Sequence, residues 1–230
     1  NDALLIGHHR DDQAETLLLQ LCRGAGVDGL AAMPPIKSLT QGQLIRPLLA
    51  YSRESLESYA NDYKLAWIND ESNDDSAFSR NFIRNDVLPL LKKRWPSVST
   101  NMARTASHCQ DAKLNLEALA KSDYPGLDKA GNTLSLDVIE QLDHARVNNI
   151  LRSWLKINQM PLPDSGMCHR IIHELIITQG ESVPEIACSH YQLRRYQQTL
   201  YLLTTKDDIV PLAKDWCCFP EALILSELSV

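Results

Sequence analysis

The sequence of 230 residues predicts an α/β domain that a long helix joins to a smaller α+β domain. Three observations lead to this fold class. The apolar run at 3–7 leads directly into an acid-rich helix start, which is typical of the edge where α/β proteins carry their chemistry. Residues 97–122 form one long helical pattern with a narrow apolar stripe. Residues 123–204 combine strand, helix and hairpin patterns.

In the first part of the chain, residues 3–7 are predicted as a buried strand and residues 11–22 as a helix. Gly24 and Gly26 are expected to end that helix and to form a tight turn. The letters of Gly24–Gly29 fit G-x-G-x-x-G, but the segment follows a helix and not a strand, so no dinucleotide site is predicted. The other expected elements are an extended stretch at 44–49, a helix at 53–62, an edge strand at 65–68, a polar loop at 69–76 and a helix at 80–93.

The second part of the chain is predicted to begin near residue 123. We expect a strand at 133–136, two or three helices between 138 and 178, and a hairpin of 191–196 with 199–203. The expected domains are therefore 1–94, a linker helix at 95–122, an α+β domain at 123–204, and the start of a further, truncated domain at 205–230. Because the chain begins beside a core strand without an initiator Met, we expect it to be an internal fragment.

Composition indicates a globular protein of the cytoplasm. Hydrophobic residues make up 44% of the chain, and no apolar run approaches the length of a membrane span. Six cysteines without framework spacing suggest reduced thiols. The net charge of −6 argues against nonspecific binding to nucleic acid, so an RNA partner would need local basic patches.

An unusual cluster of charged side chains lies at the start of the first helix: His8, His9, Asp11, Asp12 and Glu15. Helical spacing places His8 with Asp12, Asp12 with Glu15, and Asp11 with Glu15 on shared faces. A helix cap explains one carboxylate, but three acids so close together repel unless a cation or a ligand amine neutralises them. We therefore favour a functional site over a simple cap.

Two further groups of residues are candidates for binding. Arg80 and Arg84 are i,i+4 and present two guanidinium groups on one helix face, which suits phosphate or carboxylate. An exposed helix that pairs with nearby acids is an equally good explanation of these two arginines alone. Arg194, Arg195 and Tyr196 place positive charge beside an aromatic ring on a strand, which is compatible with RNA contact, although a charged edge strand has the same pattern.

A zinc site is not expected from the cysteines and histidines of the second part. His169 and His173 are i,i+4, but with Cys168, Cys188 and His190 they fit no standard ligand spacing. The simpler interpretation is a helix surface with incidental cysteines. No metal ligand is predicted.

Over about ninety residues, ordered motifs resemble the tRNA(Ile)-lysidine synthetase family of the N-type ATP pyrophosphatases. The motifs are His8-His9-x-Asp11-Asp12-Gln13-x-Glu15-Thr16, Arg23-Gly24-x-Gly26, Gly29-Leu30, Arg46-Pro47-Leu48-Leu49, Arg53, Trp67-Ile68-x-Asp70-x-Ser72-Asn73, Arg80-Asn81-x-x-Arg84 and Pro89-Leu90-Leu91. The helical unit from 134 to 179 and the Arg-Arg-Tyr strand look like the family's tRNA-contacting domain. The resemblance implies a Rossmann-like domain of the adenine nucleotide α hydrolase type, of which residues 1–94 would be the C-terminal part.

The resemblance also implies a reaction. ATP would adenylate C2 of the wobble cytidine of an isoleucine tRNA with a CAU anticodon, and the ε-amine of free lysine would displace AMP to give lysidine. By motif position, Asp12, Glu15 and Arg84 would be catalytic, with His8, His9, Asp11, Arg80 and Asn81 near the ATP or the target base. Arg194, Arg195, Tyr196 and Arg152 would contact tRNA. Mg²⁺ would accompany ATP, and a homodimer of the full-length protein is compatible with the family.

Two parts of the family pattern are not found in these residues: the Ser-Gly-Gly-x-Asp-Ser phosphate-binding loop, which is expected upstream of Asn1, and the far C-terminal domain. We therefore expect the 230 residues alone to be inactive with ATP and, with open sheet edges, to aggregate. Two alternatives stay open, another adenylating tRNA-modifying enzyme such as a thiolation enzyme, and a non-catalytic RNA-binding module. A thiolation enzyme would typically carry paired cysteines, and Cys22 stands alone in its region.

Overall fold

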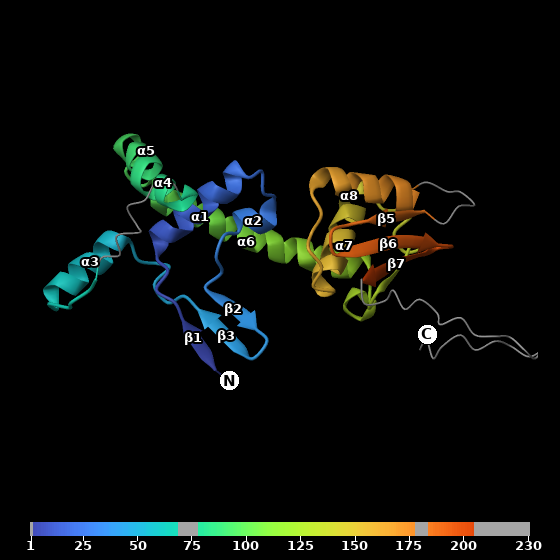
Figure 1. The fold of residues 1–230 in the computed structure, drawn as a ribbon, viewed down its shortest axis with the longest axis horizontal. Helices are drawn as coiled ribbons and strands as arrows, with labels where there is room; N and C mark the ends of the chain where they lie inside the picture. The colour runs from blue at the N-terminus through green and yellow to red at the C-terminus, as the bar shows by residue number, and fades with distance from the viewer. Residues whose placement is uncertain (1, 69–77, 178–183, 205–230) are drawn as a thin grey trace, which may run out of the picture. The chain divides into compact units, whose positions relative to one another are not determined.

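The computed structural model describes residues 2–68, 78–177 and 184–204. The chain divides into two compact units, Asn1–Leu116 and Glu117–Val230. The division falls inside the longest helix, α6 (Val98–Asp123), which confirms the long helix predicted from the sequence. Each unit has its own sheet and helices (Figure 1). None of the described helices is long and apolar enough to cross a membrane.

Unit 1 contains a three-stranded sheet in the order β1-β3-β2. Strand β1 (Ala3–Leu5) pairs in parallel with β3 (Gly42–Ile45), and β2 (Ile36–Leu39) pairs antiparallel with β3. Gly42 has φ +145°, and a Cβ there would lie 2.2 Å from the carbonyl oxygen of Asp2, so only glycine permits this close approach of β1.

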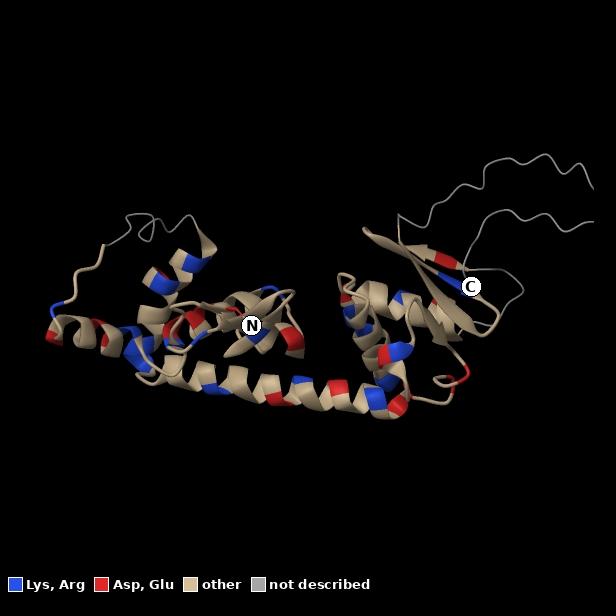
Figure 2. Ribbon diagram, turned by 90° about the horizontal axis from the view of Figure 1, so that it is seen from below, with Lys and Arg blue, Asp and Glu red and all other residues tan. Residues whose placement is uncertain are grey.

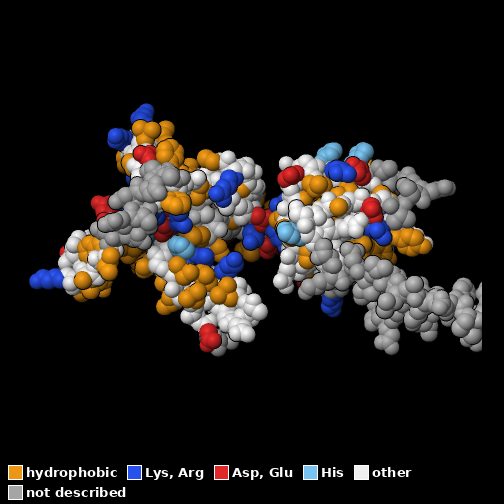
Figure 3. Space-filling view, in the orientation of Figure 1, with side chains coloured by type: hydrophobic (Ala, Val, Ile, Leu, Met, Phe, Trp, Pro, Cys, Tyr) orange, Lys and Arg blue, Asp and Glu red, His pale blue; other side chains and the backbone are white. Residues whose placement is uncertain are grey.

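Three strand predictions in unit 1 need correction. Of the run at 3–7 predicted as a buried strand, only Ala3–Leu5 forms a strand, and its three residues are exposed. The edge strand predicted at 65–68 is wrong, since these residues form no strand. Strand β2 was not predicted, and the predicted stretch at 44–49 is a strand only as far as Ile45. Figure 3 shows the resulting orange apolar surface over β1–β3.

The helices of unit 1 position the charged cluster. Helix α1 (Arg10–Cys22) begins after its N-cap His9 and ends at Arg23, followed by Gly24 at φ +70°, which confirms the predicted glycine stop. The short helix α2 (Val27–Leu30) follows. Helix α3 (Arg53–Asp62) has no buried residue. The predicted helix at 80–93 is confirmed as α4 (Ser79–Phe82), a π-helical turn η2 (Ile83–Val87) and α5 (Leu88–Arg94).

A small core holds α1 against the 79–94 helical segment. Ala14, Ile83 and Leu88 are its buried members. The side chain of Gln13 donates to the carbonyl oxygen of Met33 (2.7 Å) and accepts from the amide of Met33 (2.9 Å). This paired hydrogen bond ties α1 to the segment that leads into β2.

Unit 2 is an antiparallel sheet with helices on one face (Figure 1). After a 3-10 turn η3 (Leu127–Lys129), the sheet has the order β4-β7-β6-β5, and the sequence did not predict β5. The strands are β4 (Thr133–Ser135), β5 (Glu185–Ala187), β6 (Tyr191–Tyr196) and β7 (Thr199–Thr204). The covering elements are α7 (His144–Ile157), α8 (Ser165–Ile171) and a π-helical turn η4 (Ile172–Ile177).

The core of unit 2 is large and apolar. Trp154 is fully buried, and its Nε1 donates to the carbonyl oxygen of Gly131 (2.9 Å). Asp143 and Asp164 cap α7 and α8 by accepting from backbone amides three residues on. The strand at 133–136, the helices and the hairpin predicted from the sequence are thereby confirmed.

Candidate active site

Two carboxylates and two guanidinium groups form the centre of the site. Arg80 donates from Nε to Glu15 (2.8 Å) and from a terminal nitrogen to Asp12 (2.8 Å). Arg84 binds Glu15 through Nε (2.7 Å) and through a terminal nitrogen (3.0 Å), and reaches Asp12 at 3.1 Å. The predicted shared faces of Asp12 with Glu15 and of Arg80 with Arg84 are therefore confirmed, and the two faces meet.

The two arginines neutralise the clustered carboxylates. Glu15 is only 1% exposed and Asp12 is 6% exposed, so each charge needs a partner. The hydrogen bond that Arg84 donates to Glu15 raises the pKa of Arg84 although burial opposes it, and the charges of Glu15 and Asp12 also raise it. The centre is balanced, with two negative and two positive groups.

Asp12 also takes part in starting the helix. One of its oxygens accepts from the backbone amide of His9 (2.8 Å), and Nδ1 of His9 accepts from the amide of Asp12 (3.4 Å). This reciprocal pair is a capping box with histidine as the cap. A carboxylate is therefore not the cap of this helix: His9 is the N-cap, and Asp12 contributes from the third helical position while also binding both arginines.

Asp11 joins three helices. One oxygen accepts from Nζ of Lys92 on α5 (2.8 Å), and the other accepts from the backbone amide of Arg53 at the start of α3 (2.9 Å). Burial of the carboxyl opposes its ionisation, but the hydrogen bonds from Lys92, Arg53 and Ser99 and the charge of Lys92 outweigh it and lower the pKa of Asp11 to about 2. Asp11 is therefore ionised at neutral pH.

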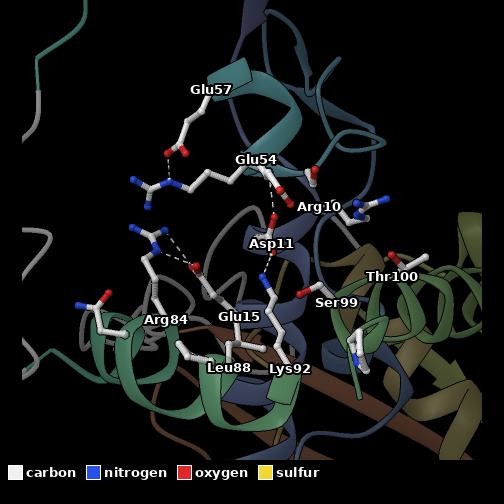
Figure 4. A pocket seen from close by; sticks show the side chains of 15 residues that line it. Arg10, Asp11, Glu15, Glu54, Glu57, Arg84, Leu88, Lys92, Ser99 and Thr100 are labelled. Atoms are coloured by element: carbon white, nitrogen blue, oxygen red, sulfur yellow. Dashed lines mark hydrogen bonds and ion pairs between the residues drawn. The ribbon is translucent and has the colours of Figure 1, made fainter. Parts of the chain in front are cut away.

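A cavity of about 540 Å³ opens beside these groups. Figure 4 shows Asp11, Glu15, Arg84 and Lys92 around it, with the acidic side chains Glu54 and Glu57 of α3 on the opposite wall. Arg10 also lines it, and the Nε of Arg10 is buried without a hydrogen bond to a described residue. A cavity with both signs of charge suits a ligand that carries both signs.

His8 lies outside the helix. The prediction that His8 and Asp12 share a helix face is wrong, because α1 begins only at Arg10. Instead, Nδ1 of His8 accepts from Nε of Arg46 (3.2 Å). Asn81 lies beside Arg80 on α4. The motif residues Asp70, Ser72 and Asn73 lie outside the described residues.

Sequence reasoning missed Lys92 and Arg46 as members of the site. Lys92 lies near the end of the predicted helix 80–93, and it meets Asp11 across 81 positions of sequence. Arg46 and Arg53 were visible in the motif series, but nothing in their local spacing indicates what they contact.

The residues predicted to contact tRNA separate into two groups. Along β6 the side chains alternate, so Arg194 and Tyr196 are exposed while Arg195 is buried. Arg195 donates to the carbonyl oxygens of Ile176 (3.1 Å) and Gln197 (3.0 Å) and to Gln198 (2.7 Å), so its side chain packs the domain and offers no surface to RNA. Arg194 pairs with Glu185 (2.7 Å), and Arg152 on α7 lies 3.9 Å from the sulfur of Cys168.

Charge in the rest of the described chain is mixed. Figure 2 shows basic and acidic residues interspersed along α6, with no continuous basic stripe on that helix. Any contact of α6 with a polyanion would therefore be opposed as well as attracted.

Comparison with known proteins decides the family. Residues 1–91 match the PP-loop domain family and residues 134–201 match the TilS substrate binding domain. Proteins named tRNA(Ile)-lysidine synthase match along the chain: that of Legionella pneumophila (strain Paris) is 48% identical over 230 residues, which is 100% of this chain and 53% of the relative. The chain belongs to the tRNA(Ile)-lysidine synthase family.

Other members of the family agree. The Coxiella burnetii (strain RSA 493 / Nine Mile phase I) protein of that name is 40% identical over 202 residues, covering 88% of this chain and 45% of the relative. The Methylococcus capsulatus (strain ATCC 33009 / NCIMB 11132 / Bath) protein is 40% identical over 215 residues, covering 90% and 48%. The chain thus spans about half the length of the curated relatives it matches. The resemblance seen in the motifs is confirmed, and a PP-loop domain implies the Rossmann-like α/β class predicted for unit 1.

Proposed function

We propose that the full-length protein containing this chain modifies isoleucine tRNA with a CAU anticodon. It would use ATP to adenylate the wobble cytidine at C2, position 34, with release of pyrophosphate, and the ε-amine of free L-lysine would then displace AMP to form lysidine. The change would move codon specificity from AUG to AUA. The observation that carries the proposal is the pairing of Asp12 and Glu15 with Arg80 and Arg84, in a chain 48% identical to a protein named tRNA(Ile)-lysidine synthase.

Asp12, Glu15 and Arg84 are the proposed catalytic residues. A lysine ammonium needs carboxylates to bind it and a route for losing its proton before the amine attacks. Asp12 and Glu15 supply two carboxylates one helical turn apart. Arg84 would stabilise negative charge on the α-phosphate as the adenylate forms and breaks down.

The balanced charges of the centre suggest an exchange of cations. Both carboxylates are already paired with arginine, so a lysine ammonium would add an uncompensated positive charge to the centre. If the Arg84 guanidinium, which is 21% exposed, turns to the phosphate, the ammonium takes its place on Glu15. One cation leaves the carboxylates as another arrives, and the buried charges stay paired throughout.

The other predicted contacts complete the proposal. ATP is the nucleotide that a PP-loop domain implies, and Mg²⁺ would accompany it. His8, His9, Asp11, Arg80 and Asn81 would lie near the ATP or the target base. Arg194, Tyr196 and Arg152 of unit 2 would contact the tRNA, through charge and through stacking on the exposed tyrosine ring. We also propose a cytoplasmic location and a homodimer of the full-length protein.

The test follows lysine incorporation into the CAU isoleucine tRNA together with ATP consumption, in the full-length protein. Asp12→Asn and Arg84→Ala should each lower kcat/KM by about 100-fold or more, since each removes a group that acts on the reacting atoms. Arg84→Lys keeps the charge but loses the two-nitrogen fork, and should also be strongly impaired.

Asp111→Asn and Arg104→Ala are matched controls, because they make the same charge changes at exposed positions of α6. Both should stay within about twofold of the wild type. Circular dichroism should find all five variants folded. Transfer of sulfur in place of lysine by the wild type would replace the substrate assignment with that of a thiolation enzyme, and tRNA binding without ATP consumption would point to an RNA-binding module.

A further inference from the structure

His8 and Arg46 lie at the carboxyl ends of two neighbouring parallel strands. Strand β1 ends at Leu5, which is in register with Ile45 at the end of β3, and the amide of Ile6 donates to the carbonyl oxygen of Ile45 (3.0 Å). The segments that follow the two strands therefore leave the sheet side by side. In open α/β sheets, ligands bind outside the carboxyl ends of the strands.

Arg46 is held rigidly on its own side of the contact. Its backbone amide donates to the carbonyl oxygen of Pro35 (2.8 Å), and a terminal nitrogen of its guanidinium donates to the carbonyl oxygen of Pro34 (2.7 Å). The remaining contact runs from Nε of Arg46 to Nδ1 of His8, at 3.2 Å.

This contact determines where the imidazole carries its proton. A guanidinium has only donors and stays protonated, so Nδ1 of His8 must accept and cannot hold a hydrogen. In a neutral ring the proton is then on Nε2. Nε2 of His8 makes no hydrogen bond to a residue in the part of the chain that the structure describes.

We propose that Arg46 is a positioning residue that holds His8 as a neutral imidazole whose Nε2–H donates to an oxygen of the bound nucleotide. His8 would thus donate a hydrogen bond during the reaction and would not act as a base. The oxygen belongs to a phosphate of ATP or to the tRNA; this identity rests on the proposed function, whereas the protonation of the ring does not.

The charges around His8 act in the same sense. Burial lowers the pKa of His8, and Asp12 opposes this by raising it. The positive charges of Arg46, Arg80 and His9 lower it further, and the net direction is downward. The ring therefore stays neutral at pH 7, as a donor with a single fixed hydrogen requires.

The first experiment observes the ring directly. Long-range proton–nitrogen NMR spectra of histidine-labelled full-length protein should give an unprotonated Nδ1 and a protonated Nε2 for His8, with the signals assigned by their loss in His8→Gln. In Arg46→Met the ring should exchange between tautomers, and its pKa should rise toward the ordinary value of about 6.5. Arg46→Lys keeps a donor and should retain the single tautomer.

A protonated Nδ1 in the wild type, or an Arg46→Met spectrum identical to the wild type, would overturn the proposal. Arg104→Met controls for the loss of a positive charge elsewhere. These spectra do not depend on catalysis, so they remain informative if the proposed reaction itself fails.

The second experiment separates a donor from a base. The amide nitrogen of His8→Gln lies near the position of Nε2 and can donate, whereas the shorter side chain of His8→Asn cannot reach it, and neither amide is a base. We expect His8→Gln to be about tenfold more active than His8→Asn, the effect of one hydrogen bond. A loss confined to KM for ATP identifies a phosphate acceptor, and a loss in KM for tRNA identifies the RNA. Equal losses in both variants would contradict the donor role.

Discussion

Asp11, Asp12 and Glu15 lie within five positions of one helix, yet each has a different set of partners. Glu15 binds two arginines, Asp12 binds the same two and also the helix start, and Asp11 binds Lys92 and the start of α3. Each carboxylate is buried, and cations or backbone amides replace water around it. The site is therefore stable at neutral pH without a ligand.

The contacts of Asp11 predict a pH dependence of stability. Its pKa of about 2 in the folded protein is below its ordinary 3.8, so the stabilisation is fully present above pH 4 and is lost as the pH falls toward 2. Asp11→Asn should lower the free energy of unfolding by about 1 to 2 kcal/mol at pH 6, less than the full shift implies because Lys92 is 46% exposed and solvent screens the pair.

Urea denaturation at pH 6 and pH 2 measures this effect. The wild type and Asp11→Asn should converge at the lower pH, whereas Asp62→Asn, at an exposed position of α3, should follow the wild type at both. A constant difference between the wild type and Asp11→Asn across this range would show that the ion pair is not its source.

Arg194 and Arg195 are adjacent, but we expect their substitutions to have opposite effects on stability and on tRNA binding. Arg195→Met should destabilise unit 2 by about 2 kcal/mol, because it leaves buried carbonyl groups without their donor. Arg194→Met should change stability by less than about 0.5 kcal/mol, since its pair with Glu185 is exposed. In tRNA binding we expect the larger effect from Arg194→Met. It alone should reduce the slope of log affinity against log salt concentration, by about 1.

Thermal unfolding and filter binding at several salt concentrations would check the two residues. A large loss of tRNA affinity in a folded Arg195→Met protein would contradict the assignment of Arg195 to packing.

At the scale of elements, the sequence predicted best what long periodic patterns determine. Helices α1, α3 and α6 and the β6–β7 hairpin lie where the patterns indicated. The alternation along β6 was also available from sequence, because three consecutive strand residues cannot share a face. Strand β2 escaped prediction since Ile36–Leu39 is short and half polar. The pairing of Lys92 with Asp11 could not be predicted, because it depends on how α5 packs beside α1.

The β2–β3 hairpin predicts that position 42 accepts only glycine. Gly42→Ala should lower the melting temperature by several degrees, because the new Cβ meets the backbone oxygen of Asp2 and the backbone is in a region unfavourable to alanine. Gly166→Ala is a suitable control, since the nearest atom to its Cβ would be a side-chain oxygen of Asp164 at 3.4 Å, which is an ordinary van der Waals contact. Equal melting temperatures for the two variants would mean that β1 and β3 separate easily.

At the scale of the whole molecule, the two units have unequal cores. The main core of unit 2 contains many fully buried side chains, Trp154, Leu193 and Leu200 among them, whereas the core around α1 in unit 1 has three buried residues. Hydrogen exchange of the full-length protein should therefore be slowest in α7, β6 and β7. It should be fastest in α3, which buries nothing. Comparable protection of α3 and α7 would contradict this prediction.

The π-helical turn Ile83–Val87 determines which side of the helical segment its charged residues face. Arg84 and Lys92 are eight positions apart, and in an unbroken α-helix they would be rotated from each other by about 80°. A π turn takes up about one additional residue, so the two side chains lie as if seven apart, on one face. Both can then reach α1, Arg84 at Glu15 and Lys92 at Asp11. Adding or removing one residue here would turn Lys92 away from Asp11 by about 100° while Arg84 stayed in place, so the number of residues in this turn is as much a part of the site as their chemistry.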